Sequence, residues 1–425
     1  MPLIVLPSDY RDKIAVARRK SGFFDLTISD SEDLMVVTGW GYTSATHGNV
    51  HITGYAKEFA GRHFLHSTKS GNGFWYRVDV DLHHNWIAMA ARDACVPADV
   101  LRRKVTGWFE AGGGDMITPI LTFTDVEGQI SVLAWEVRHG MAVPARVDIV
   151  EHDRDRLASL DGHWPTEDLA HAKIVVAGAG SIGSAACDAL VAYGARRLRL
   201  VDPDHLYWHN FARHTTDISQ AGRFKVHAVK QRLLDHDQHA DIDTSTANVI
   251  ADADVIREHL LDAAAMLVCV DGVEPRRVVN HLAYRAGVPA IFACVLANGR
   301  VGEALRILPG RHGCLLCHRR ALVDAGVIDP EPSLDLGYGT GSRHLPMTAV
   351  GGDLAFVGQV AAKATVATLL ERAGHLDQRL PGEHAAIGLR PAGDLPPPFD
   401  VGVAEVRWTD PWPSRADCPT CATNR

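Results

Sequence analysis

Short apolar runs alternate with helical patterns through the middle of the chain. Lys173–Ala177 and Arg197–Val201 are β-branched or apolar runs, and small apolar residues at helical spacing fill Ser184–Tyr193 between them. Such runs predict buried strands, and the spacing between them predicts a helix. The pattern continues with predicted helices at 225–236 and 275–286 and predicted strands at 265–271 and 290–295. This alternation predicts a mostly parallel sheet covered by helices on both faces.

The pattern changes toward the C-terminus. Gly299–Leu308 predicts an antiparallel hairpin arm, and 348–373 contains a long apolar helix that we interpret as core or as a dimer face. Leu380–Asp400 is rich in Pro and Gly and predicts a surface linker. Val403–Trp408 predicts a last strand.

The first 150 residues have a different pattern, which predicts an α+β domain of uncertain topology and role. Strands are expected at 33–39, 50–55, 73–82, 117–123 and 131–137, and helices at 86–95 and 98–109. The charged stretch Glu151–Arg156 predicts a joint between two domains, residues 1–150 and 151–425.

Composition limits the classes of function. The chain has 425 residues, 46% hydrophobic residues and a formal net charge of -8, so a large core is expected, and no bulk cationic field would draw it to nucleic acid or a membrane surface. We find no apolar run expected to span a bilayer, and the N-terminus lacks the basic lead-in and length of a secretory signal. We expect a cytoplasmic protein, and eight cysteines in this length agree with a reducing compartment.

A glycine motif follows the first strand of the alternating region. Gly178, Gly180 and Gly183 have the spacing G-x-G-x-x-G, and Asp202 ends the second strand. In a Rossmann-like, doubly wound sheet the first glycine permits the turn, the second admits a phosphate, and the third lets helix and strand pack closely. The helix N-terminus attracts an anion, and Asp202 can accept hydrogen bonds from a ribose. The motif therefore predicts an adenine nucleotide site.

Polar side chains beyond the second strand indicate which kind of nucleotide binds. Asn210, Arg213 and Lys225 follow Asp202, and cationic groups can neutralise the charge that develops as pyrophosphate leaves. Asp271 ends another predicted strand in the sequence CVDG, where open sheets bind ligands, and it can hold Mg²⁺ between phosphates.

Two C-x-x-C pairs, Cys314/Cys317 and Cys418/Cys421, form the second strong motif. Four thiolates suit tetrahedral Zn²⁺ in a closed, structural site, which would fix the C-terminal tail to the domain. A redox pair or unpaired core thiols are the alternatives. The other thiols in apolar surroundings, Cys187, Cys269 and Cys294, are expected to be buried.

Taken in order, these motifs resemble a known family over residues 154–421. GAGSIGS resembles the glycine loop of the adenylating enzymes that activate ubiquitin-like and sulfur-carrier proteins, which include ThiF, MoeB and the adenylation half of ubiquitin-activating enzyme. VDPDHLYWHNFARH resembles the family pattern D-x-D-x-V-x-x-S-N-L-x-R-Q, GRFKV resembles G-x-x-K, and CVDG resembles the metal-binding aspartate motif.

The resemblance implies residue roles and partners. It places Asp202, with Asp204 in the same motif, near the ribose, the triphosphate on Asn210, Arg213 and Lys225, and Mg²⁺ on Asp271. Arg154 or Arg156 stands where the family has an arginine that reaches a partner subunit's nucleotide, which implies a homodimer or pairing with another adenylation-like domain. The implied reaction joins the C-terminal glycine of a small β-grasp protein to AMP, with ATP and Mg²⁺ as cofactors.

The chain departs from the family pattern in three places. Phe211 and His214 replace Leu and Gln of N-L-x-R-Q, and the stretch Gly337–Gly351 lacks the cysteine with which many relatives form a thioester or acyl persulfide. We therefore expect the adenylate to pass to a separate conjugating enzyme or sulfur donor. The third departure is the N-terminal domain, which minimal family members lack.

Two other functions remain open on the sequence. One is a catalytically silent, adenylation-like scaffold that pairs with an active partner, which the retained Asp202, Arg213, Lys225 and Asp271 disfavour. The other is an NAD-dependent oxidoreductase, which would leave the Asn/Arg/Lys cluster without a purpose.

Overall fold

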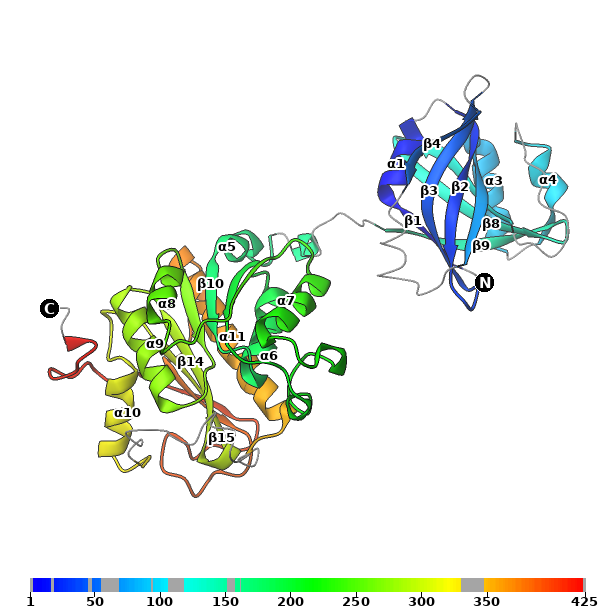
Figure 1. The fold of residues 1–425 in the computed structure, drawn as a ribbon. Helices are drawn as coiled ribbons and strands as arrows, with labels where there is room; N and C mark the ends of the chain where they lie inside the picture. Colours follow the sequence, from blue (N-terminus) through cyan, green and yellow to red (C-terminus); the bar gives the residue numbers. More distant parts are fainter. Residues whose placement is uncertain are drawn as a thin grey trace. The chain divides into compact units, whose positions relative to one another are not determined.

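A computed structural model describes residues 3–16, 19–44, 48–54, 69–92, 95–105, 118–150, 157–160, 162–329 and 348–422. The chain divides into two compact units, Met1–Asp155 and Arg156–Arg425 (Figure 1). Each unit has hydrophobic clusters of its own.

The first unit is built on a sheet that closes on itself. Its strands follow the order β1-β3-β2-β5-β7-β8-β9-β6, and β1 pairs with both β3 and β9. Trp40 and Trp75 meet edge to face in its core with ring centroids 6.1 Å apart, and Tyr10 and Ile14 belong to the same buried cluster. The elements are β1 (Leu3–Pro7), α1 (Ser8–Val16), β2 (Ser21–Ile28), β3 (Leu34–Ser44), β4 (Gly48–Gly54), β5 (Ser70–Arg77), α3 (Val80–Ala90), β6 (Val96–Pro97), α4 (Ala98–Arg102), β7 (Thr118–Val126), β8 (Gln129–Arg138) and β9 (Met141–Val150).

The sequence patterns predicted only some of the strands and helices of the first unit. Four expected strands match β3, β4, β7 and β8, but the expected strand 73–82 ends as β5 at Arg77, and α3 starts at Val80, before the expected helix. Asp79 explains the early start, because its carboxylate accepts a hydrogen bond from Leu82 N and caps the helix. The elements β1, α1, β2 and β9 were not predicted.

The second unit is a mixed eight-stranded sheet, which confirms the predicted α/β class. The order is β12-β11-β10-β13-β14-β15-β16-β17, parallel from β12 to β14 and antiparallel from there to β17. The strands are β10 (Lys173–Ala177), β11 (Arg197–Val201), β12 (Asp241–Ser245), β13 (Ala265–Val268), β14 (Ala290–Leu296), β15 (Val301–Ile307), β16 (His384–Gly388) and β17 (Val406–Thr409).

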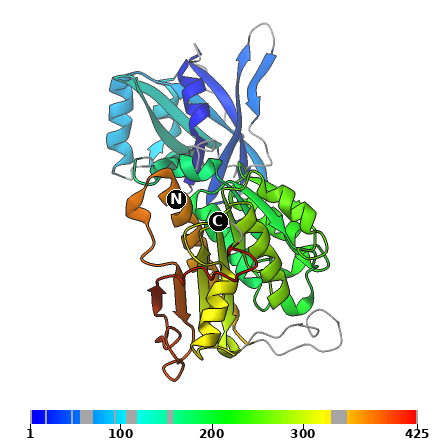
Figure 2. The same cartoon turned by 90° about the vertical axis from the view of Figure 1, so that its left-hand side faces the viewer.

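Helices cover both faces of this sheet (Figure 1). Residues of α6, α7 and α11 pack on one face, and residues of α8, α9 and α10 pack on the other. Figure 2 shows α10 in yellow alongside the antiparallel strands. The helices are α5 (Thr166–His171), α6 (Ser181–Tyr193), α7 (Lys225–His236), α8 (Ala253–Leu260), α9 (Val273–Arg285), α10 (Leu315–Asp324) and α11 (Gly351–Ala373).

One expectation about the C-terminal part is wrong. The stretch Leu380–Asp400 is not merely a surface linker, because it contains β16, all five residues of which are buried. The Pro and Gly signals come from the turns that flank this short strand.

The long helix α11 is a core element. By length and hydropathy alone it would suffice to cross a membrane, contrary to our expectation that no apolar run does so. However, 67% of its most apolar stretch of 18 residues is buried within the unit. A Cβ on Gly358 would lie 2.7 Å from Ile182 O, so α11 packs directly on α6.

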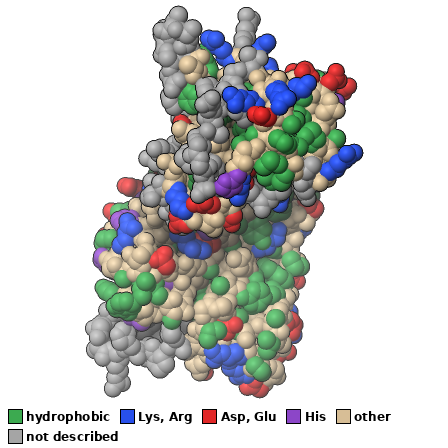
Figure 3. Space-filling view, turned by 90° about the vertical axis from the view of Figure 1, so that its right-hand side faces the viewer, with side chains coloured by type: hydrophobic (Ala, Val, Ile, Leu, Met, Phe, Trp, Pro, Cys, Tyr) green, Lys and Arg blue, Asp and Glu red, His purple; other side chains and the backbone are tan. Residues whose placement is uncertain are grey.

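The molecular surface carries both kinds of charge: the face in Figure 3 shows basic and acidic side chains interspersed.

Candidate nucleotide site and cysteine centre

The strand order of the second unit's sheet reverses at β10. The chain proceeds from β10 to β11 and β12 on one side, and then returns to place β13 on the other side of β10. Ligands bind open parallel sheets at such a reversal of strand order, outside the carboxyl ends of the strands. The glycine loop follows β10 at this edge.

Each of the three glycines is explained by the space around its own Cα. Gly178 has φ of +91°, and a Cβ there would lie 2.7 Å from the Cys269 carbonyl oxygen on the neighbouring chain segment. A Cβ on Gly183 would lie 1.9 Å from Gly178 O, so no larger residue fits where α6 meets the loop. Gly180 precedes α6, and no atom lies within 4 Å of a Cβ built there. The loop is thus held closely on the inside and open in front of the α6 N-terminus.

Asp202 fixes the loop from the end of β11. Its Oδ2 accepts a hydrogen bond from Ala179 N at 2.7 Å, and its Oδ1 accepts one from Asp204 N at 2.9 Å. Burial raises the pKa of Asp202, and the charge of Lys225 opposes that rise. Both oxygens already bond backbone amides, so a ribose hydroxyl would use their remaining lone pairs.

The basic side chains are held in different ways. Lys225 Nζ forms an ion pair with Asp204 Oδ2 at 2.7 Å at the start of α7. Arg213 has its Nε buried, with no hydrogen-bond partner in the described part of the chain. Asn210 is buried, and its Oδ1 accepts a hydrogen bond from Tyr207 N. A Cβ on Gly351 would lie 3.1 Å from Arg213 Cα, so the N-terminus of α11 adjoins Arg213.

His214 connects the arginine loop to the glycine loop, a role that the sequence did not suggest. Its Nε2 lies 2.8 Å from Ala179 O, and its Nδ1 lies 2.9 Å from Thr216 Oγ1 and 3.3 Å from Thr216 N. Since a carbonyl oxygen only accepts, Nε2 carries the proton and Nδ1 accepts from Thr216. Burial lowers the pKa of His214 to about 4, which keeps this neutral form. Asp202 and His214 therefore hold the N–H and the C=O of Ala179.

The remaining expected site residues are only partly placed. Asp271 is exposed just beyond β13, before Gly272, which has φ of +84° and precedes α9. Next to it, Arg276 Nε donates to Val270 O at 3.2 Å. Arg154 and Arg156 lie outside the described residues, as does most of the cysteine-free stretch Gly337–Gly351.

The two C-x-x-C pairs converge as predicted. One Sγ from each of the four cysteines lies within 4.8 Å of the others, and all four are buried. The sulfur atoms of Cys317 and Cys421 are 3.3 Å apart and those of Cys314 and Cys418 are 3.6 Å apart, far longer than a disulfide bond. Thiolates around tetrahedral Zn²⁺ are separated by about 3.8 Å, so this group fits the ion. Cys187, Cys269 and Cys294 are buried, as expected.

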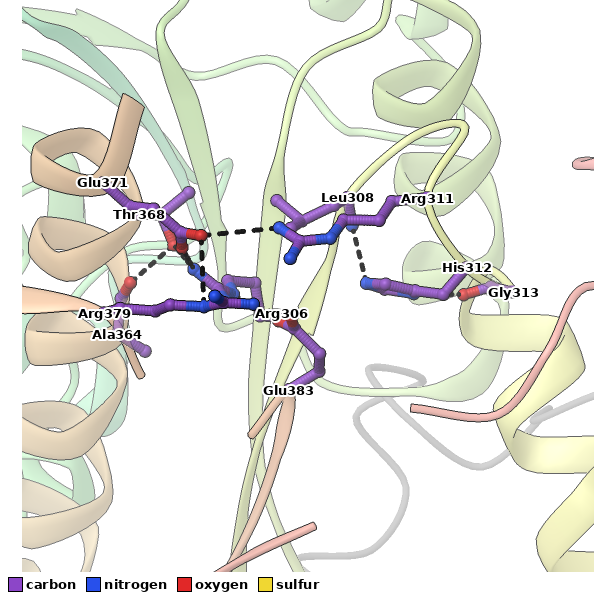
Figure 4. A network of polar contacts seen from close by, with 10 residues as sticks. All are labelled: Arg306, Leu308, Arg311, His312, Gly313, Ala364, Thr368, Glu371, Arg379 and Glu383. Carbon is purple, nitrogen blue, oxygen red and sulfur yellow. Dashed lines mark hydrogen bonds and ion pairs between the residues drawn. The ribbon is translucent and has the colours of Figure 1, made fainter. Parts of the chain in front are cut away.

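A buried ionic network surrounds Arg306 at the C-terminal end of β15 (Figure 4). Arg306 on β15 is 1% exposed and donates from Nη1 to Glu371 Oε2 of α11 at 2.8 Å and from Nη2 to Glu383 Oε1 at 3.0 Å. Arg311 approaches Glu371 from the next loop at 3.4 Å. His312 follows, and its Nε2 accepts from Leu308 N. The network joins α11, β15 and the segment before β16 just ahead of the first cysteine pair.

Comparison with known proteins shows to which family the second unit belongs. The family model described as "ThiF family" matches residues 152–377, more than half of the 425 residues. The chain belongs to the ThiF family. The match includes the glycine loop, Asp202, Arg213, Lys225, Asp271 and the first cysteine pair. It ends before Cys418 and Cys421, so the cysteine group of this ThiF-family chain is completed outside the matched region.

Three curated relatives match parts of this ThiF-family chain. It is 30% identical over 190 residues to "Sulfur carrier protein ThiS adenylyltransferase" of Bacillus subtilis (strain 168), covering 42% of the chain and 55% of that protein. It is 24% identical over 173 residues to "Ubiquitin-like modifier-activating enzyme 5" of Dictyostelium discoideum, covering 38% and 45%. It is 30% identical over 137 residues to "Molybdopterin-synthase adenylyltransferase" of Salmonella typhimurium, covering 32% and 54%.

The chain thus spans about half the length of the curated relatives it matches. Among solved structures, the crystal structure of E. coli MccB with ATP is similar, at 16% identity and a TM-score of 0.46, over 61% of this chain and 69% of that one.

Proposed function

We propose that this chain is an ATP-dependent adenylyltransferase that activates the C-terminal glycine carboxylate of a ubiquitin-like or sulfur-carrier protein. The observation that carries the proposal is the clamp on the glycine loop. Asp202 and His214 fix Ala179 from two sides, while the space at Gly180 stays open before the α6 N-terminus. Membership of the ThiF family and the names of the three curated relatives support this chemistry.

In this proposal each side chain has a role beside the glycine loop. The triphosphate lies against Gly178, Gly180 and Gly183, with its charge met by Asn210, Arg213 and Lys225. Asp202 and Asp204 face the ribose. Among these proposed roles, that of Arg213 is the best supported. Its buried Nε lacks a hydrogen-bond partner within the described residues, and a phosphate oxygen would supply one. Lys225 reaches the phosphates from its ion pair with Asp204.

Asp271 is the proposed ligand for Mg²⁺. It offers an exposed carboxylate at the carboxyl edge of the sheet, next to the β10 loop, and oxygen donors are what this ion prefers. Bound there, Mg²⁺ would neutralise phosphate charge.

The reaction needs positioning and charge neutralisation rather than a protein nucleophile. A carboxylate oxygen of the terminal glycine attacks the α-phosphorus and forms a C–O–P bond. The bond from that phosphorus to the bridging oxygen breaks, and pyrophosphate leaves with the electron pair. Arg213 and Lys225 stabilise the charge that moves onto pyrophosphate.

The remaining assignments are proposals of the same kind. Residues 1–150 carry no assigned chemistry, and a role in binding the carrier protein or in pairing fits that domain best. A separate conjugating enzyme or sulfur donor would take the adenylate onward. We propose a cytoplasmic homodimer, in which Arg154 or Arg156 reaches the partner subunit's nucleotide, and we expect neither nucleic acid nor membrane as a partner. The four cysteines would hold Zn²⁺ in a structural role.

Exchange of labelled pyrophosphate into ATP tests this function, with a panel of small carrier proteins that end in Gly-Gly. We expect exchange with at least one carrier and its loss in Asp271→Ala, with unchanged circular dichroism. A chain that binds a carrier but supports no exchange would be a scaffold, and the proposal would then be wrong.

A further inference from the structure

A second group of metal-binding side chains lies beneath α10, separate from the four cysteines. Glu303 of β15, His318 of α10 and His384 of β16 are each at most 2% exposed, and one ligand atom from each lies within 4.8 Å of the other two. Glu303 Oε1 is 3.0 Å from His384 Nε2 and 3.7 Å from His318 Nε2. These spacings are near the value of about 3.4 Å that separates nitrogen and oxygen ligands around tetrahedral Zn²⁺.

His318 distinguishes this group from a hydrogen-bonded core cluster. Both of its ring nitrogens are buried, and neither has a hydrogen-bond partner within the part of the chain that the structure describes. Its Nε2 lies 3.7 Å from Glu303 Oε1, beyond hydrogen-bond distance. Burial of an imidazole without a hydrogen-bond partner costs free energy, because its hydrogen bonds to water are lost and not replaced. A metal ion on Nε2 would supply the missing interaction.

The surroundings provide the groups that usually support metal ligands. His384 Nδ1 lies 3.2 Å from Thr409 Oγ1, which fixes the ring while Nε2 points inward. Arg319 Nη1 donates to Glu303 Oε1 at 2.7 Å, and Nη2 contacts Oε2, so the carboxylate is oriented by a charged donor. Such outer partners are typical of metal-ligating histidine and carboxylate.

A thiol adjoins the same group. Cys294 Sγ lies 3.5 Å from Glu303 Oε2 and 3.9 Å from Arg319 Nη2. Cys294 is not among the residues whose ligand atoms all lie within 4.8 Å of one another, so it belongs to the surroundings of the group rather than to its ligands.

We propose that Glu303, His318 and His384 form a second metal site that binds a divalent transition-metal ion of the zinc class. Mixed imidazole and carboxylate donors suit Zn²⁺, and burial of all three residues favours a structural role. The ion would join α10 to β15 and β16. Because His318 directly follows Cys317, the two ions would hold the first turn of α10 from two sides.

Zinc content of the purified full chain tests this inference. We expect about two zinc ions per chain, and about one in His384→Asn, which changes β16 and leaves the cysteines untouched. Cys418→Ser should also retain about one, and the double variant should retain none. His281→Asn is the matched control, since His281 contacts Thr420 near the cysteines, outside the proposed ligand set, and should leave both ions.

Cobalt spectroscopy keeps the inference testable if a variant folds poorly. Titration of the zinc-free wild-type chain with Co²⁺ should give two spectral components, one with intense thiolate charge-transfer bands and one with the weaker bands of a nitrogen- and oxygen-rich site. A single tetrathiolate component, with one zinc ion that Cys418→Ser abolishes, would overturn the second site. Neither readout depends on adenylation.

Discussion

Arg213 is the residue on which the proposed nucleotide binding depends most directly. Its Nε is buried and has no hydrogen-bond partner among the described residues, and its Cα adjoins Gly351 at the start of α11. Arg213→Ala should lower the rate of pyrophosphate exchange by on the order of 100-fold, because one preorganised charge on the phosphates is lost. Arg223→Ala is the control, since Arg223 is exposed nearby and donates from Nη1 to Gln220 Oε1. Equal effects of the two substitutions would count against the role of Arg213.

His214 stands where the family pattern has Gln, and a Gln side chain could make the same two kinds of hydrogen bond. His214→Gln retains a donor for Ala179 O and an acceptor for Thr216, whereas His214→Ala loses both. We expect a raised KM for ATP in His214→Ala and a nearly normal value in His214→Gln. Steady-state kinetics check this, and identical KM values in the two variants would contradict it.

The same residue predicts a pH dependence of stability. The pKa of His214 is about 4 in the folded chain, below its ordinary value of about 6.5. The unfolded chain therefore binds the extra proton between these values, so the free energy of unfolding falls as pH drops from about 6.5 toward 4, by up to ~3 kcal/mol. Urea unfolding at several pH values should show a shallower decline in His214→Gln, and an unchanged slope would exclude this source.

The residues of the site were predictable to the extent that short spacing defines them. The glycine loop and its following acid are local, so Gly178, Gly183 and Asp202 lie where the motif requires. The clamp by His214 was not predictable, because Ala179 and His214 are brought together only by the sheet. The same holds for Glu303, His318 and His384, which are far apart in the chain.

At the scale of elements, long patterns were predicted best. The helix α7 matches its expected range, and β15 is antiparallel as expected. In contrast, β16 was missed because five residues between Pro- and Gly-rich turns give no periodic signal. Its burial depends on partners β15 and β17, which the local sequence does not reveal.

The network around Arg306 should dominate the stability of this edge of the sheet. Arg306→Ala leaves Glu383 and Glu371 without their buried partner, so we expect a loss of about 3–5 kcal/mol in the free energy of unfolding. Arg311→Ala, which removes a half-exposed contact with the same Glu371, should cost less than about 1 kcal/mol. Chemical denaturation of both variants measures the difference, and similar losses would contradict a buried, cooperative network.

At the scale of the whole molecule, the chain should unfold in two steps. Each unit has hydrophobic clusters of its own, and the closed sheet of the first unit and the mixed sheet of the second share no strands. Calorimetry should therefore show two transitions, and a chain lacking residues 1–155 should keep one of them at its original temperature. A single transition that disappears on truncation would show that the units fold together.

The alternation of strands and helices predicted the second unit's class from sequence. The closed sheet of the first unit was not predictable, because its closure depends on pairing of β1 with β9 across nearly the whole unit. The roles of both units in binding a carrier protein remain proposals that the exchange assay addresses.

A structure of the chain crystallised with Mg²⁺ and a non-hydrolysable ATP analogue is the sharpest test of the proposed nucleotide site. We expect phosphates before the α6 N-terminus at Gly180, within hydrogen-bond distance of Arg213 and Lys225, with Mg²⁺ on Asp271. A nucleotide bound elsewhere, or phosphates that contact neither basic side chain, would contradict it.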